Sequence, residues 1–313
     1  MKKRKLTALI MSAIMGAMLF TGCGSSQSEA TDEASTQPAA ESSEEASVEE
    51  AAETDKTVTE AADTEETAQA DGPVLSSIKE AGKLVVGTAS GYPPYEFIDI
   101  TSPDQAVVGI DMELAKKIAE ELGVELEIQD MTFTSLISSI PTHKVDMAIA
   151  GISITEERKE TMDFSEPYLE AAQKILILKE NAEKYNTLES FSGEAVAAEK
   201  STTQEAVAQE LMADSPLVSL EKVPDCLMEL QNGKVAGVVV EGIVGEQYVF
   251  AYDNIVFSDA DMERSKTSAV ALDKGNEDLI AIINKVIAEN VENGNFDKWV
   301  EEYSEKAAAN AKE

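Results

Sequence analysis

The chain has 313 residues, a formal net charge of −35 and a single histidine. Its length allows two or three domains, and its acidity excludes nucleic acid and anionic membrane surfaces as partners, because like charges repel. No metal-ligand spacing is present in the sequence, so we expect neither a metal nor a cofactor.

The first 23 residues have the pattern of an export signal. Four basic residues precede an apolar run from Leu6 to Phe20, which is shorter than the roughly 20 residues that span a bilayer. The run ends in Leu19-Phe20-Thr21-Gly22-Cys23, which resembles the lipobox of bacterial lipoproteins. The resemblance implies a signal peptide over 1–22 and a lipid on Cys23, palmitate included, that anchors the chain to the cell membrane. The alternative is a secretory signal cleaved elsewhere.

An acidic segment follows. Residues 24–72 hold fifteen Asp and Glu against Lys56 alone, with no aromatic residue, Leu or Ile. Such a segment cannot bury enough apolar surface to offset its ordering entropy, so we expect 23–72 to be the lipidated cysteine and a disordered tether. The other cysteine, Cys226, lies in an apolar-periodic stretch and is expected in the core.

From Pro73 onwards, short apolar runs alternate with helical periodicity, which predicts α/β architecture with largely parallel sheets. In the first part we expect a helix that Asp111 caps and Gly123 ends, and a helix over 133–140. The expected strands of this part are 83–88, 124–128 and 145–150.

A second set of elements repeats this construction. Expected strands lie at 175–178, 195–198, near Val218 and at 235–240, and expected helices at 202–212 and 225–231. Two helices, 276–292 and 296–303, close the pattern. The repetition predicts a second lobe of similar design.

The loops after the strands carry suitable ligand chemistry, because ligands of open parallel sheets bind beyond the carboxyl ends of strands. After the strand ending at Ala150, Gly151 allows close backbone approach, Ser153 offers a hydroxyl and Thr155 can cap a helix. Arg158 falls in the first turn of that helix, where a cation is disfavoured. It therefore indicates an anionic partner: a ligand carboxylate, or on the surface Glu156, Glu157 or Asp163.

Several motifs together resemble the family 3 extracellular solute-binding proteins, over about 74–303. They are Thr88 to Phe97 (TASGYPPYEF), Gly109 to Ala115 (GIDMELA), Lys144 to Met147 (KVDM), Ser153 to Arg158 (SITEER) and Asp163 to Tyr168 (DFSEPY). The resemblance implies a two-lobed, type II periplasmic-binding-protein-like fold with the ligand in the interlobe cleft. Lobe 1 would hold 73–172 plus 260–313, and lobe 2 would hold 173–259.

The family also implies residue roles at the ligand's carboxylate. Arg158, Ser153 and the backbone of Gly151 match the positions that hold it, and Thr202 and Thr203 match a turn of the second lobe that donates to it. The two threonines also open a helix, so capping is their alternative role. Glu241 matches an acidic position that accepts from the α-ammonium; its alternative is a helix N-cap.

Other positions would face the ligand side chain. Tyr92 and Phe133 match its aromatic walls, although Phe133 alone also fits a helix core. Glu96 and Glu199 would discriminate between ligands. Ala89 stands where binders of cationic amino acids often place aspartate, whereas Glu199 favours a cation, so arginine-, glutamine- and cystine-like ligands all remain open.

The implied function is extracytoplasmic binding of a polar amino acid and delivery to an ABC permease, without catalysis, by a monomer. The lobes would close about two chain crossings near Gln173 and Ser258. Two alternatives remain on the same fold: a ligand sensor for a membrane receptor, and a periplasmic dehydratase of the arogenate or prephenate type. His143 lies in a turn and is expected in solvent.

Overall fold

The computed structural model describes residues 71–311. The predicted signal peptide, the lipidated Cys23 and nearly all of the acidic tether lie outside this range, so they stay predictions. Within the range, no helix combines the length and the apolar character that crossing a membrane requires.

The first sheet has five strands in the order β4-β1-β5-β13-β6. Strand β1 lies between β4 and β5 and is parallel to both, whereas β13, from far along the chain, is antiparallel to its two neighbours. The strands of this first sheet are β1 (Lys83–Thr88), β4 (Glu125–Asp130), β5 (Met147–Ala148), β6 (Met162–Phe164) and β13 (Ala271–Asp273). The mostly parallel arrangement follows from the strand and helix alternation of the sequence.

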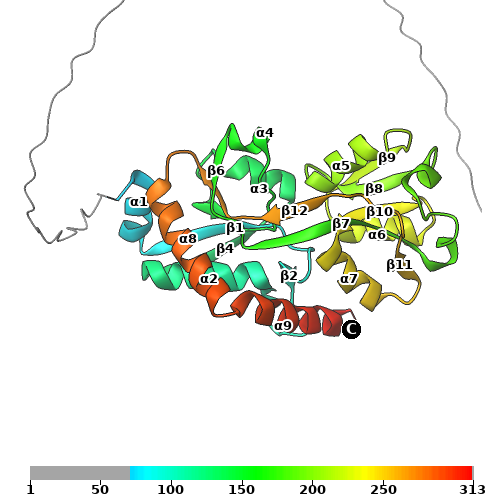
Figure 1. The fold of residues 1–313 in the computed structure, drawn as a ribbon. Coiled ribbons are helices and arrows are strands. Elements are labelled where there is room, and N and C mark those ends of the chain that lie inside the picture. The colour runs from blue at the N-terminus through cyan, green and yellow to red at the C-terminus, as the bar shows by residue number, and fades with distance from the viewer. Residues whose placement is uncertain (1–70, 312–313) are drawn as a thin grey trace, which may run out of the picture. The chain divides into compact units, whose positions relative to one another are not determined.

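Helices cover this sheet, and a short hairpin of β2 (Phe97–Ile98) and β3 (Val107–Val108) lies beside it (Figure 1). The helices are α1 (Pro73–Ala81), α2 (Ile110–Leu122), α3 (Phe133–Ser139), α4 (Glu156–Lys159), α8 (Glu277–Glu292) and α9 (Asn295–Asn310). Helix α2 ends where Gly123 takes a left-handed conformation, with φ of 68°, as glycine does at helix C-termini.

The second sheet has the order β11-β7-β10-β8-β9, and β12 pairs with β7 alone. Strands β10, β8 and β9 are parallel, and β7 is antiparallel to β10 and β11. Its strands are β7 (Leu169–Leu178), β8 (Val196–Glu199), β9 (Leu217–Leu220), β10 (Gly237–Glu241), β11 (Ile255–Phe257) and β12 (Ser265–Ser268). Its helices are α5 (Thr203–Leu211), α6 (Val223–Gln231) and α7 (Gly242–Ala251), with 3-10 turns η1 (Lys179–Asn181) and η2 (Leu188–Phe191).

Strands β7 and β12 form a two-stranded ribbon between the two sheets (Figure 1). The first residues of β7 pair with β12, from Leu169 opposite Ser268 to Ala172 opposite Ser265, and its later residues pair with β10 and β11. The ribbon therefore carries both passages of the chain from one sheet to the other. The limits of the two lobes given above stay a prediction.

The cores consist of aliphatic side chains buried between sheets and helices. Leu84, Val86 and Leu136 of the first sheet and its helices are 0 % exposed, as are Ile175 and Val238 of the second. Truncation of such a side chain to alanine removes transfer energy and leaves a cavity, at a cost of about 2–5 kcal/mol. The two sheets are thus rigid platforms for the loops at their edges.

The α/β fold class is confirmed, and several predicted boundaries shift. Strand β5 is shorter than 145–150, β7 begins at Leu169, and α9 continues to Asn310. The prediction that Asp111 caps α2 is wrong. Gly109 occupies the N-cap, and the buried Asp111 carboxylate instead accepts from the Gly151 amide and the Tyr168 hydroxyl, at 2.7 and 2.8 Å.

Candidate functional site

A small cavity lies where loops of the two sheets meet. Every predicted ligand-contacting residue except Glu241 lines it, together with three residues that the sequence analysis did not assign. The lining residues are Ala89, Tyr92, Glu96, Phe133, Ala150, Gly151, Ser153, Arg158, Glu199, Thr202, Thr203, Gln204 and Lys266. The free volume among them, about 10 Å³, is close to that needed for one water molecule. A larger ligand therefore needs the walls to separate.

Arg158 reaches the cavity from α4, whose first turn Thr155 caps by accepting from the Arg158 amide at 3.1 Å. Its guanidinium donates to two backbone carbonyls, Ser153 at 2.8 Å and Ser201 at 2.9 Å, and lies 5.3 Å from the centre of the Phe133 ring. Burial lowers the pKa of Arg158 to about 10. Between residues 71 and 311 no carboxylate lies within ion-pair distance of this guanidinium.

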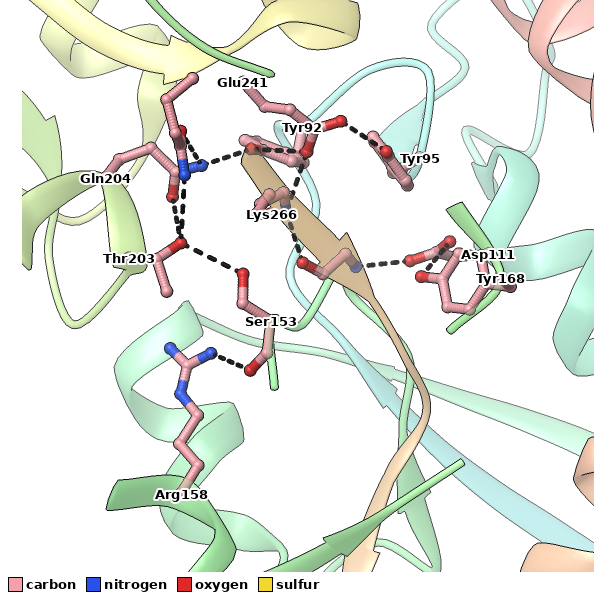
Figure 2. Close-up of polar contacts among 12 residues, drawn as sticks. Tyr92, Tyr95, Asp111, Ser153, Arg158, Tyr168, Thr203, Gln204, Glu241 and Lys266 are labelled. Carbon is pink, nitrogen blue, oxygen red and sulfur yellow. Dashed lines mark hydrogen bonds and ion pairs between the residues drawn. The ribbon is translucent and has the colours of Figure 1, made fainter. Parts of the chain in front are cut away.

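Within 71–311, Arg158 forms no ion pair with Glu156, Glu157 or Asp163, the surface partners considered as its alternative. The Asp163 carboxylate accepts from Lys274 at 2.9 Å and from the Gly275 amide at 2.8 Å, and Glu156 pairs with Lys159 at 2.8 Å. These carboxylates already have partners, while the Arg158 side chain extends toward the cavity (Figure 2).

Hydroxyl groups face each other across the same end of the cavity. Ser153 Oγ and Thr203 Oγ1 lie 3.1 Å apart, although one follows β5 and the other begins α5. Thr202 takes the expected cap role, because its hydroxyl accepts from the Glu205 amide at 3.3 Å. Ser201, before it, has φ of 65°, in the left-handed region that side-chain-bearing residues disfavour.

Two carboxyl groups line the cavity in addition to these hydroxyls. Glu96, after β1, is 1 % exposed, and its Oε2 has no hydrogen-bond partner among the described residues. Burial and the neighbouring Asp111 carboxyl hold the pKa of Glu96 well above its usual range. Glu199 ends β8 in the second sheet, and burial raises the pKa of its carboxyl to about 8. The cavity is thus an unfavourable place for a carboxylate that lacks a cation.

Lys266 supplies a second cation, and the sequence analysis missed it. It extends from β12, and its Nζ lies 2.8 Å from Glu241 Oε2 and 2.6 Å from the Gly151 carbonyl oxygen (Figure 2). The side chains of Lys266 and Glu241 are 5 % and 0 % exposed. Residues 265–268 are all polar and do not resemble a strand, so the sequence gives no local sign that Lys266 lies on a buried strand face.

Glu241 lies at the N-cap of α7 without capping it, and takes its partners from the cavity wall instead. Tyr95 Oη donates to its Oε1 at 2.5 Å and Tyr92 Oη to its Oε2 at 3.3 Å. Gln204 Nε2 in turn donates to Tyr92 Oη at 3.3 Å. Glu241 is therefore behind the lining, with Lys266 between it and the cavity.

Gly151 connects these groups through its backbone amide and its backbone carbonyl. Its amide donates to Asp111, while its carbonyl accepts from Lys266. Its φ is 52°, and an added Cβ would lie 3.3 Å from Lys266 Nζ and 3.4 Å from the Tyr92 ring. Only glycine fits there without strain. No group of three or more His, Cys, Asp and Glu in the described part of the chain could hold a metal ion.

A family model described as bacterial extracellular solute-binding proteins, family 3, matches residues 84–306. The chain belongs to this family. Its two-lobed α/β fold, expected from the sequence, is thereby confirmed.

Relatives within the family have different named ligands. The arginine-binding extracellular protein ArtP of Bacillus subtilis (strain 168) is 32% identical over 230 residues, which cover 71% of this chain and 87% of that protein. The L-cystine-binding protein TcyJ of Escherichia coli (strain K12) is 27% identical over 234 residues, 74% and 87% of the two chains. A solved structure of AbpA from Streptococcus pneumoniae, bound to L-arginine, has 34% identity and a TM-score of 0.73, and the match covers 74% of this chain and 99% of that one.

Proposed function

We propose that the protein binds a free amino acid with a cationic side chain, of the L-arginine class, outside the cytoplasm and delivers it to an ABC importer. The observation that carries this choice is a pair of buried carboxyls, Glu96 and Glu199, that line one cavity with Arg158. The named ligands of ArtP and AbpA support it.

At one end of the cavity, Arg158 would hold the ligand's carboxylate. A guanidinium donates two parallel hydrogen bonds to a carboxylate, and here it has only carbonyl partners to exchange. The hydroxyls of Ser153 and Thr203 would add donors, and their 3.1 Å contact would open to admit the carboxylate between the lobes. The Gly151 amide already donates to Asp111, so we assign the main role to the side chains.

The carboxyl groups of Glu96 and Glu199 would accept from the ligand's cationic group. A buried carboxylate without a cation is costly, which is why burial raises the pKa of Glu199. A guanidinium or ammonium group would favour the ionised carboxylates and gain charge-assisted hydrogen bonds. Glu199 would thus supply the acidic group that Ala89, on the opposite lobe, does not.

The aromatic residues Tyr92 and Phe133 would pack against the aliphatic part of the ligand. Both side chains are buried and line the cavity, at 7 % and 6 % exposure. Aromatic faces suit alkyl chains and cations alike. In this proposal Phe133 serves the ligand as well as the core around α3.

Calorimetry with L-arginine, L-citrulline, L-lysine, L-glutamine and L-cystine tests the ligand class. L-Arginine should bind most tightly, and L-citrulline, which replaces the guanidinium with a neutral group of the same shape, at least roughly thirty-fold more weakly, because loss of a charge pair in a buried site costs about 2 kcal/mol or more. Equal binding of citrulline, or tightest binding of glutamine or cystine, would contradict the proposal.

A further part of the proposal is that the protein binds the amino acid without converting it. Mass spectrometry should recover the bound amino acid unchanged after long incubation; a converted product would favour a dehydratase instead.

We also propose that Cys23 carries lipid and that the protein acts as a membrane-anchored monomer. Incorporation of a fatty-acid analogue in the wild type, and its loss in Cys23→Ser, tests the anchor; light scattering of the protein without its signal tests the monomer.

A further inference from the structure

The most buried ion pair of the described chain lies beside the ligand cavity, and the proposed function does not use its cation. Among residues 71–311, Lys266 and Glu241 form an ion pair in which both side chains are at most 5 % exposed. Lys266 lines the cavity, whereas Glu241 does not. The cation therefore lies where a ligand would meet it.

We propose that Lys266 is an affinity- and specificity-determining residue, an internal cation that competes with the ligand's α-ammonium for Glu241 and the Gly151 carbonyl. This inference rests on the proposed binding of an amino acid. It adds that the ammonium-binding acceptors are already occupied by the chain's own ammonium group, which the ligand must displace.

The contacts of Lys266 Nζ are those that a primary ammonium group requires. It has a carboxylate oxygen at 2.8 Å, a carbonyl oxygen at 2.6 Å, and the ring centres of Tyr92 and Tyr95 at 5.3 and 5.6 Å. An ammonium group has three donors, and aromatic faces add a cation–π attraction. An α-ammonium group presents the same three donors, so both groups fit one set of acceptors.

The position of these acceptors makes competition unavoidable. Gly151 follows β5 of the first sheet and Glu241 ends β10 of the second, so Lys266 joins the two walls in the same way as a bound ligand would. Nζ already lies within hydrogen-bond distance of both oxygens, at 2.8 and 2.6 Å, and a second ammonium group beside it would be repelled as a like charge. An α-ammonium that binds Glu241 and Gly151 would therefore displace Lys266 Nζ.

The competing explanation is that Lys266 only neutralises Glu241 as a structural ion pair. A buried carboxylate that loses its cation is strongly destabilised, so Lys266→Met lowers the melting temperature of the unliganded protein under both explanations. Ligand affinity separates them. Competition predicts tighter binding when the lysine is removed, because apparent affinity is reduced by the fraction of molecules in which the site is free.

The experiment compares two probes on four proteins. The probes are L-arginine and 5-guanidinopentanoate, which is arginine without its α-amino group; the proteins are wild type, Lys266→Met, Lys266→Arg and Lys285→Met. Lys285→Met is a matched control, because Lys285 pairs with Glu121 at 2.6 Å and does not line the cavity. Dissociation constants are measured by calorimetry at one pH and ionic strength.

We expect Lys266→Met to bind L-arginine about ten-fold more tightly or better, with a much smaller change for 5-guanidinopentanoate. The dissociation constant for 5-guanidinopentanoate divided by that for L-arginine then rises. Lys266→Arg, which keeps a cation, and Lys285→Met keep the wild-type ratio. If Lys266→Met fails to fold, Lys266→Gln, which keeps an N–H donor for Gly151, carries the same comparison.

The inference is overturned if a folded Lys266 variant binds L-arginine no more tightly than the wild type and keeps the wild-type ratio of the two dissociation constants. The proposed function is then left intact. Failure of the wild type to bind any amino acid overturns the proposed function itself. The two failures are therefore distinguishable in one set of titrations.

Discussion

Two regions of the cavity wall each supply a cation, and they differ in how that cation is neutralised. Among the described residues, the Arg158 guanidinium on α4 has only backbone carbonyls as hydrogen-bond partners, whereas Lys266 on β12 is paired with a carboxylate that is 0 % exposed. A buried cation without a counterion gains most from an incoming carboxylate. We therefore assign the unpaired cation to ligand binding and propose that the paired one opposes it.

Among the substitutions that test this comparison, removal of Arg158 should have the largest effect on ligand affinity. We expect Arg158→Ala to weaken L-arginine binding by about 2–5 kcal/mol, because the ligand's carboxylate would be buried without a cation. Arg158→Lys should recover only part of the loss, since an ammonium lacks the bidentate geometry. Calorimetry measures both, and melting curves verify folding. Binding by Arg158→Ala at wild-type strength would show that the carboxylate lies elsewhere.

Replacement of Glu199 tests the carboxyl groups of the cavity wall. Glu199→Gln should weaken L-arginine binding by about 1.5–3 kcal/mol, the range for hydrogen bonds to charged groups, while the affinity for L-citrulline changes less. Glu194→Gln is a control of the same chemistry, because Glu194 pairs with Lys184 at 2.8 Å and does not line the cavity. If the two variants lose equal affinity for both ligands, Glu199 does not contact the cation.

The pH dependence should follow the same carboxyl. Burial raises the pKa of Glu199 to about 8, above its value in the unfolded chain, so the folded protein holds this proton between about pH 4.3 and 8. L-Arginine binds the ionised form, so its affinity should rise with pH up to about 8, by at most ten-fold per unit. Titrations from pH 6 to 8.5 measure the slope, and Glu199→Gln should flatten it.

The stability of the unliganded protein should depend on pH in the opposite direction to ligand affinity. Since the folded state binds the Glu199 proton more tightly than the unfolded state, the stability it contributes is complete below about pH 4.3 and is lost as the pH rises to about 8. Melting curves of wild type and Glu199→Gln should therefore diverge as the pH rises, with the wild type losing more. A constant difference between the two across this range would contradict the pKa assignment.

The smallest expected effect concerns the turn that supports Arg158. Ser201 accepts from the guanidinium through its carbonyl and has φ of 65°, which costs a non-glycine residue about 1 kcal/mol. Ser201→Gly should raise the free energy of unfolding by less than about 1 kcal/mol, since it also loses the 3.2 Å contact with Thr134. Denaturant melts measure this. A loss of stability would mean that the contact outweighs the strain.

Regular elements were predictable from the sequence because they depend on local pattern. Strand β1 falls at the predicted 83–88, since its apolar run ends at loop residues. Helix α2 ends at Gly123 as expected because glycine adopts the left-handed conformation readily. Strand β7 begins earlier than expected, because its first residues pair only with β12 and do not form a buried apolar run.

Long-range polar contacts were not predictable in the same way. Asp111 has the spacing of a helix cap, but its partners are Gly151 and Tyr168, 40 and 57 residues away. Lys266 lies in a polar stretch whose pairing depends on β7, so no local pattern places it against Glu241. Arg158 could be selected as a candidate because a cation in a first helical turn is unusual, and the family resemblance favoured a ligand carboxylate as its partner.

The ribbon of β7 and β12 has a practical consequence. Because the two passages are hydrogen-bonded from Leu169 to Ala172, we expect them to bend together and the walls to separate by motion about nearly a single axis. Dyes attached to Glu160 and Gln209, which line a second pocket formed by α4, α5 and their flanking loops, would then report one distance that maps to one degree of opening. The protein would thus suit an optical amino acid sensor in which a single dye-to-dye distance reports how far the site is open.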